Sequence, residues 1–213
     1  MAIAHDPLKA SDGAIGLYDV ATGKQRAAIM PEAMLRYPYA MVFSHDSASL
    51  YTVHDSAAVN IWDTATGKRR GRQFTALRPS PDAPDGKRKE PRITWAAVAP
   101  DLKTLVTSQG RELLFWDVER CELAATMPSE SADEGGGIAI SPNGRLLLMV
   151  DRHFSGSDAV RVFDLNSRRV IARCDSGQGR PRCYAFSPDG TRLVTGMEDG
   201  TALVWDVAAA VQK

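Results

Sequence analysis

The stretch that decides the fold covers residues 186–206 and reads FSPDGTRLVTGMEDGTALVWD. Its first turn is Ser187-Pro-Asp-Gly190, because Pro presets the φ of a turn and Asp hydrogen-bonds the local backbone. A short apolar run around Leu193 follows, and Glu198-Asp-Gly200 forms a second turn. A last apolar run ends in Trp205-Asp206. The stretch therefore predicts short β-strands that follow one another through tight turns.

The same pattern recurs along most of the chain. An aromatic residue followed by Asp closes five segments, and neighbouring aromatics are 42 to 54 residues apart. After the Asp comes a tight polar turn and another short run, and a further apolar run precedes each turn of the Ser-Pro-Asp type. Each unit therefore predicts four short strands, which we name a, b, c and d in chain order. The five pairs are Tyr18-Asp19, Trp62-Asp63, Trp116-Asp117, Phe163-Asp164 and Trp205-Asp206.

Composition distinguishes the inner and outer strands of each unit. Strand a has apolar residues on both faces, as in Met41-Val-Phe43, which is typical of a strand that is covered on both sides. Strand d begins with charged residues, as in Arg69-Arg-Gly-Arg72, and charges on an outer edge strand discourage unwanted pairing. We therefore expect a radial array of sheets with strand a on the inside and strand d on the outside.

Across residues 10–207 the chain resembles the WD-repeat family of β-propellers, most specifically in the unit that ends at Trp205-Asp206. The resemblance implies an all-β fold, a β-propeller built from four-stranded antiparallel blades. No unit has the Gly-His pair that precedes strand a in many family members. The buried His-Ser-Asp-Trp network of those members is therefore not assumed, and the repeats look like those of the bacterial branch.

We predict one WD-repeat segment over residues 1–213, with about four and a half blades. Alignment of the first unit on the last places the first strand b at residues 6–10, and the last unit has no outer strand d. Two arrangements fit these ends. An open arc, or a fragment of a larger propeller, would expose apolar faces of its terminal blades and predicts poor solubility or self-association. In a closed ring, the N-terminal strand d would instead complete the last blade.

The predicted boundaries are a partial blade at 1–36, blades at 37–78, 93–128 and 135–174, a loop insertion at 79–92, and a blade without its outer strand at 181–207.

The composition argues against several classes of protein. Lys and Arg total 26, as do Asp and Glu, and this balance disfavours a nucleic-acid or acidic-membrane binder. No apolar run is long enough to span a bilayer, and three Cys do not make a disulfide scaffold. The first residues show no signal peptide, which predicts a cytoplasmic protein, or a periplasmic one if an upstream segment carries a signal.

The polar motifs predict structural roles. His45-Asp46 and His54-Asp55 are separated by the length of a strand, so they do not share a metal ion and are interpreted as turn residues. Ala65-Thr-Gly-Lys68 lacks the first Gly and the Ser or Thr of a phosphate loop. The repeated aromatics belong to the core, and the Asp after each caps the c–d turn. We therefore predict no catalytic residue, no cofactor and no metal ion, and we expect the Cys residues to be semi-buried structural thiols.

Loop charge is the most informative feature for function. In such a propeller the a–b and c–d turns lie at one end of each sheet, here called the turn end, and the b–c and d–a loops lie at the other, the loop end. The 79–92 insertion is rich in basic residues, the next d–a loop is acidic, and the one after carries Arg again. Opposite local charges of this kind set the register of a docked protein. The candidate partner-binding residues are Arg78, Lys87, Arg88, Lys89, Arg92, Glu130, Asp133, Glu134, Arg152, His153, Phe154, Arg180 and Arg182.

The resemblance and the loop charges together predict a non-catalytic scaffold that binds other proteins, as the WD-repeat segment of a larger bacterial protein. An alternative is part of a propeller enzyme with its active site in the central channel. The residues at the starts of strand a make no acid–base pair or ion site, since they are Tyr39, Thr94, Gly136 and Arg182. Nucleic-acid binding through residues 68–72 is disfavoured by the neutral net charge and by the edge-strand role of these bases.

Overall fold

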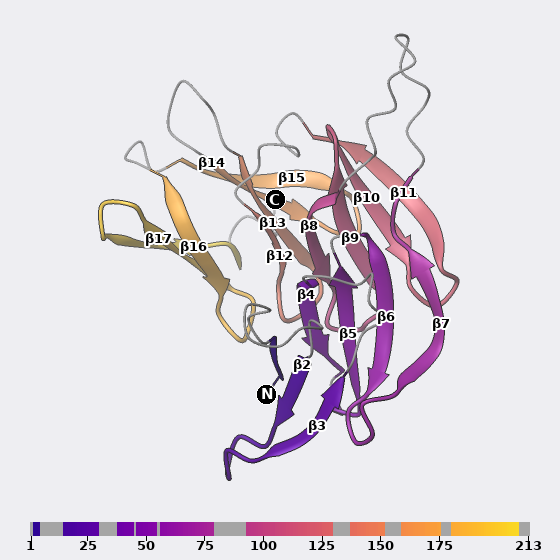
Figure 1. Ribbon diagram of the computed structural model, residues 1–213. Coiled ribbons are helices and arrows are strands. Elements are labelled where there is room, and N and C mark those ends of the chain that lie inside the picture. Colours follow the sequence, from indigo (N-terminus) through magenta and orange to yellow (C-terminus); the bar gives the residue numbers. More distant parts are fainter. Residues whose placement is uncertain are drawn as a thin grey trace. The chain divides into compact units, whose positions relative to one another are not determined.

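The computed structural model describes residues 2–4, 15–29, 38–44, 46–54, 56–78, 93–129, 137–151, 159–175 and 180–208. These residues form strands β1 to β18, which lie in five separate antiparallel sheets (Figure 1). The chain divides into two compact units, residues 1–93 and 94–213. No helix in the described part of the chain is long and apolar enough to cross a membrane.

The first unit contains two sheets. The sheet β1-β2-β3 consists of β1 (Ala2–Ala4), β2 (Ile15–Tyr18) and β3 (Gln25–Ile29). The sheet β4-β5-β6-β7 consists of β4 (Pro38–Phe43), β5 (Ser49–His54), β6 (Ala58–Asp63) and β7 (Arg69–Thr75). The first strand b is therefore β1, upstream of residues 6–10, where alignment of the units placed it. Residues 6–10 themselves lie outside the described part of the chain.

The second unit contains three sheets. The sheet of β8 (Ile93–Val98), β9 (Thr104–Gln109), β10 (Glu112–Asp117) and β11 (Glu122–Pro128) has four strands. So does the sheet of β12 (Gly137–Ile140), β13 (Leu146–Asp151), β14 (Ala159–Asp164) and β15 (Arg169–Asp175). The sheet of β16 (Pro181–Phe186), β17 (Arg192–Met197) and β18 (Ala202–Asp206) has three described strands. Within each sheet every strand pairs with the next along the chain, so the predicted order of strands in the blades is confirmed.

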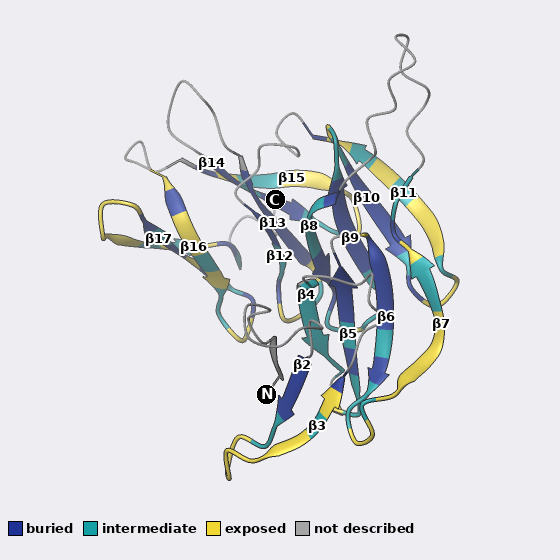
Figure 2. Cartoon of the chain, viewed as in Figure 1, coloured by how far each residue is buried: buried dark blue, intermediate teal, exposed yellow. Residues whose placement is uncertain are grey.

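Burial follows the predicted order on the outside of the blades but not on the inside. Strands d are largely exposed, as β7 and β11 are in Figure 2, while β9 and β10 are largely buried. Strand a was expected to be covered on both faces, yet only half of the residues of β8 are buried and half of the residues of β16 are exposed. The reason is that strand a is the inner edge of its sheet, whereas strands b and c have a hydrogen-bonded neighbour on each side. Strands b and c therefore carry most of the core.

The core lies between successive sheets of a unit. In the first unit, Ile15 and Leu17 of β2 pack with Leu50 and Trp62 of the next sheet. In the second unit, Val106 and Phe115 pack with Leu147 and Phe163 of the following sheet. Leu148 and Val162 then pack with Leu193 and Trp205 of the last sheet. The repeated aromatics are therefore core residues, as their equal spacing predicts.

Candidate functional site

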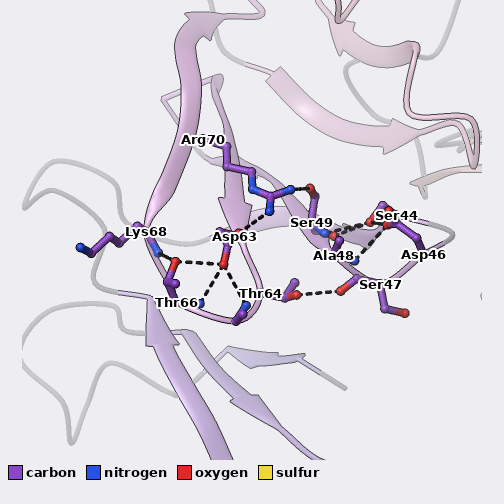
Figure 3. Close-up of polar contacts among 11 residues, drawn as sticks. Ser44, Asp46, Ser47, Ala48, Ser49, Asp63, Thr64, Thr66, Lys68 and Arg70 are labelled. Carbon is purple, nitrogen blue, oxygen red and sulfur yellow. Dashed lines mark hydrogen bonds and ion pairs between the residues drawn. The ribbon is translucent and has the colours of Figure 1, made fainter.

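The aspartates that close strand c build the c–d turns at the turn end. The carboxylate of Asp63 accepts hydrogen bonds from the amides of Ala65, at 3.0 Å, and Thr66, at 2.8 Å, and from the Thr66 hydroxyl at 2.9 Å (Figure 3). These bonds, led by the Thr66 amide, hold the pKa of Asp63 below its usual range. Asp19, Asp117 and Asp164 accept the equivalent amide hydrogen bonds. The prediction that the Asp caps the c–d turn is confirmed for these four residues.

Three of the described a–b turns at the same end use a Ser and an acidic or amide residue, whereas the turn between β8 and β9 has Ala99 in place of the Ser. The Ser44 hydroxyl donates to Asp46 at 2.6 Å and accepts the Ser49 amide at 2.8 Å (Figure 3). In the last sheet the Ser187 hydroxyl donates to Asp189 at 2.5 Å and accepts the Arg192 amide at 2.9 Å. The hydroxyl bond from Ser187 is the main reason that the pKa of Asp189 falls to about 2. These carboxylates are ionised and stabilise their turns by accepting hydrogen bonds. A general acid must be protonated near neutral pH, which would require a raised pKa instead.

An arginine on strand d ties the turn end of the second sheet together. The Arg70 guanidinium on β7 forms an ion pair with Asp63 at the end of β6 and donates to the Ser49 hydroxyl of β5 at 3.1 Å (Figure 3). The Thr64 hydroxyl also donates to the carbonyl of Ser47 at 2.7 Å, which joins the c–d turn to the a–b turn. These contacts hold the strand ends in place, and the charges of Arg70 and Asp63 neutralise each other within the sheet.

A buried hydrogen bond between strands b and c recurs in three sheets and was missed by the sequence analysis. The indole N–H of Trp62 donates to the Thr52 hydroxyl at 2.9 Å, and Trp116 and Trp205 donate to Thr107 and Thr195. The Thr52 hydroxyl also contacts Nε2 of His54 at 2.9 Å. The signal was available, because a Thr precedes each of these Trp residues by nine or ten positions. In the sheet with Phe163, which has no N–H, Met149 takes the place of the Thr.

Two predicted roles need correction. His54 lies at the end of β5, where strand b was expected to end, but it is fully buried, which its interpretation as a turn residue did not predict. Its Nε2 contacts the Thr52 hydroxyl, which also accepts the Trp62 indole N–H, so the three side chains form one buried hydrogen-bonded group. The three cysteines are free thiols, of which Cys121 is half-buried and Cys174 is buried, where burial raises the thiol pKa. Cys183, on β16, is exposed.

Three of the predicted partner-binding residues lie in the described part of the chain. Arg78 is half-buried just after β7, in the first unit. Arg180 and Arg182 are exposed at the start of β16, and Arg182 forms an ion pair with Glu198. The others, which fall outside the described residues, are Lys87, Arg88, Lys89, Arg92, Glu130, Asp133, Glu134, Arg152, His153 and Phe154.

The geometry agrees with a comparison of the sequence with known families. Residues 170–206 match the family "WD domain, G-beta repeat". This segment of the chain is therefore a WD repeat. The matched segment covers β15 to β18, so one WD repeat runs in the order d-a-b-c and contributes to two sheets.

Relatives of this WD-repeat chain match it over about half of its length. It is 29% identical over 114 residues to serine-threonine kinase receptor-associated protein of Dictyostelium discoideum, covering 53% of this chain and 36% of that protein. It is 26% identical over 122 residues to protein groucho of Drosophila melanogaster, covering 54% and 16%. It is 24% identical over 113 residues to apoptotic protease-activating factor 1 of Danio rerio, covering 53% and 8%.

A solved structure supports the fold over a longer part of the chain. Hydrazine synthase of Kuenenia stuttgartiensis superposes with a TM-score of 0.61 and 21% identity, covering 84% of this chain and 49% of that one. At this identity the likeness concerns the arrangement of strands. The WD-repeat chain is therefore all-β with propeller-type blades.

Proposed function

We propose that this WD-repeat chain is a non-catalytic scaffold that binds other proteins as part of a larger protein. The observation that carries the proposal is the use of the recurrent polar groups. The aspartates of the c–d turns and the serines of the a–b turns hydrogen-bond their own turns, so they serve the framework. What differs between units is the charge of the loops, which a rigid framework presents to partners.

The loops at the loop end supply the proposed docking charges. The 79–92 insertion is basic and the d–a loop with Glu130, Asp133 and Glu134 is acidic. Arg180 and Arg182 stand exposed at the start of β16. Alternating charges of this kind steer a partner and fix its register more than they add raw affinity. A partner is therefore expected to present charges of both signs.

Affinity enrichment from a lysate of the native host tests this site. The variant K87E/R88E/K89E reverses three charges in the insertion, and its matched control, K68E/R69E/R72E, reverses three charges at the outer strand β7. We expect recovery of the partner to fall several-fold with the first variant and to stay near wild type with the second. Equal recovery with all three proteins would remove the insertion as a docking site.

The alternative function is part of a propeller enzyme with a central-channel site. Of the residues at the starts of strand a, Thr94 and Arg182 have described side chains, and Arg182 is engaged with Glu198. The scaffold is favoured because the carboxylates of the c–d turns are held ionised by their turns. Elemental analysis of the purified protein distinguishes the two. Stoichiometric zinc or calcium would favour the enzyme.

We also propose that the chain self-associates through its last sheet. Val194 and Val204 are cross-strand partners on one face of that sheet and are 38% and 64% exposed. The equivalent pair Leu148 and Val162 is fully buried against the following sheet. An apolar face of this kind is unusual on a soluble monomer. Sedimentation velocity should show concentration-dependent association that V194T/V204T weakens, and a monodisperse monomer at all concentrations would refute it.

We further propose that the protein is cytoplasmic, that it is of bacterial origin and that it does not bind DNA. A cytoplasmic location is supported by the three free thiols, which are typical of a reducing compartment. A bacterial origin is supported by the lack of a Gly-His pair before strand a. The absence of DNA binding is supported by the neutral net charge. Cell fractionation tests the location, and retardation of labelled duplex DNA at low salt would contradict the last point.

A further inference from the structure

A groove of about 330 Å³ lies at the turn end of the second unit. It is lined by residues of two neighbouring sheets, the one of β8–β11 and the one of β12–β15. Its apolar lining includes the exposed Ala124 of β11 and the half-buried Leu165 of the next c–d turn, above the buried Phe115 of β10.

Arg168 gives this groove its most unusual feature. It occupies the left-handed position of the c–d turn, with a φ of 56°, where the first unit has Gly23 and Gly67. Residues with a Cβ are strained in this region of φ, and such strain concentrates at functional sites. The Arg168 guanidinium extends from its own sheet over the Phe115 ring of the neighbouring sheet, 5.5 Å from the ring centroid. An exposed arginine is thus fixed above an aromatic surface.

Two other charged residues of the groove form ion pairs, and the Asp101 carboxylate accepts the Lys103 amide of its own turn. Asp117 accepts the Arg120 guanidinium at 2.6 Å, and Lys103 lies 3.6 Å from Glu119. Arg168 makes its contact with Phe115 and forms no ion pair with any described residue. A guanidinium is a planar fork that binds a carboxylate through two parallel hydrogen bonds. The groove therefore offers the Arg168 cation beside apolar side chains, with the Asp101 carboxylate on the neighbouring sheet.

We propose that this groove docks an extended segment of a partner protein, with the carboxylate of an Asp or Glu on Arg168. An apolar side chain next to that acid packs beside Phe115 and Leu165. Asp101, which lines the groove from the other sheet, disfavours a run of several acids, so the segment carries an isolated one. The inference rests on the proposed scaffold function and adds a second surface, with its own partner chemistry.

Selection from a random dodecapeptide display library on the full chain tests the groove, followed by fluorescence polarisation with the selected peptides. We expect peptides with an acidic residue next to an apolar one. Arg168→Gln should weaken their binding about tenfold, the loss of one charge-assisted contact. The control Arg169→Gln changes the adjacent exposed arginine, which does not line the groove, and should leave binding unchanged.

Other outcomes would overturn the inference. Selection of no peptide, peptides without an acidic residue, or equal binding by the wild type and Arg168→Gln would each do so. Dimerisation that depends on Arg168 in sedimentation velocity would place a second copy in the groove instead. Arg168→Gly keeps a turn residue that the first unit uses, so lost binding in a variant with an unchanged melting temperature does not reflect unfolding. These results are independent of the loop-insertion variant, so the two proposals fail separately.

Discussion

The same c–d turn is used differently in the two units. In the first unit Gly67 takes the left-handed position, and a Cβ built there would lie 2.5 Å from the carbonyl oxygen of Ala28 in the neighbouring sheet. In the second unit Arg168 takes that position and reaches over Phe115 beside a groove. The turn hydrogen bonds to Asp63 and Asp164 are alike. A residue that is shared by the repeats, such as Gly67, therefore maintains the framework. A residue that differs from its equivalents, such as Arg168, provides a side chain that a partner can contact.

The largest expected effect is at the closed contact between the sheets of the first unit. Gly67→Ala should lower the free energy of unfolding by about 3 kcal/mol, from left-handed strain plus a clash with backbone that cannot move aside. The matched control is Gly23→Ala, where φ is also positive but nothing lies within 4 Å of the new Cβ. It should cost only about 1 kcal/mol. Urea unfolding of both variants checks this, and equal losses would show that contact with Ala28 is unimportant.

The second prediction compares a polar and an apolar residue at one position of strand c. Asn60 and Leu114 are cross-strand partners of Thr52 and Thr107, and neither amide atom of the fully buried Asn60 has a hydrogen-bond partner. Asn60→Leu should stabilise the protein by about 1–2 kcal/mol, because it removes unpaired polar atoms from the core. The reverse change, Leu114→Asn, should destabilise it. A lower urea midpoint for Asn60→Leu would mean that the Asn60 amide makes a stabilising contact.

A smaller effect is expected at the c–d turn between β10 and β11, which has Cys121 where the first unit has glycine. Cys121 has a φ of 56° at the position of Gly67 and makes only a weak hydrogen bond to the Val118 carbonyl, at 3.6 Å. Cys121→Gly should therefore raise stability by about 0.5–1 kcal/mol through relief of left-handed strain. Differential scanning calorimetry measures the change. A lower melting temperature would indicate that the thiol contributes packing that outweighs the strain.

The smallest effect concerns pH and compares two a–b turns. Asp189 and Asn143 take the same place beside Ser187 and Ser141. Because the pKa of Asp189 is lowered to about 2 in the folded state, its contribution to stability is present above the ordinary value of 3.8 and is lost as the pH falls toward 2. Asp189→Asn should therefore flatten the fall in melting temperature over that interval. An unchanged acid profile would show that Asp189 does not contribute to it.

The sequence predicts the framework well because the framework repeats. The spacing of Trp62, Trp116, Phe163 and Trp205 predicted the sheets and the core, and the Asp after each predicted the turns. His54 was misread, because burial of a polar residue at a strand end depends on the facing sheet. The groove was missed because it arises where two sheets meet, and Arg168 looks in sequence like any charge that opens strand d. The charged loops remain a prediction.

The central claim is that departures from the repeat, and not the repeat itself, carry binding. Arg168→Gly restores the residue of the first unit and tests it most directly when stability and peptide affinity are measured on the same preparation. The account predicts a melting temperature equal to or above that of the wild type, with the affinity for the selected acidic peptide reduced about tenfold. Full affinity, or a clear loss of stability, would contradict it.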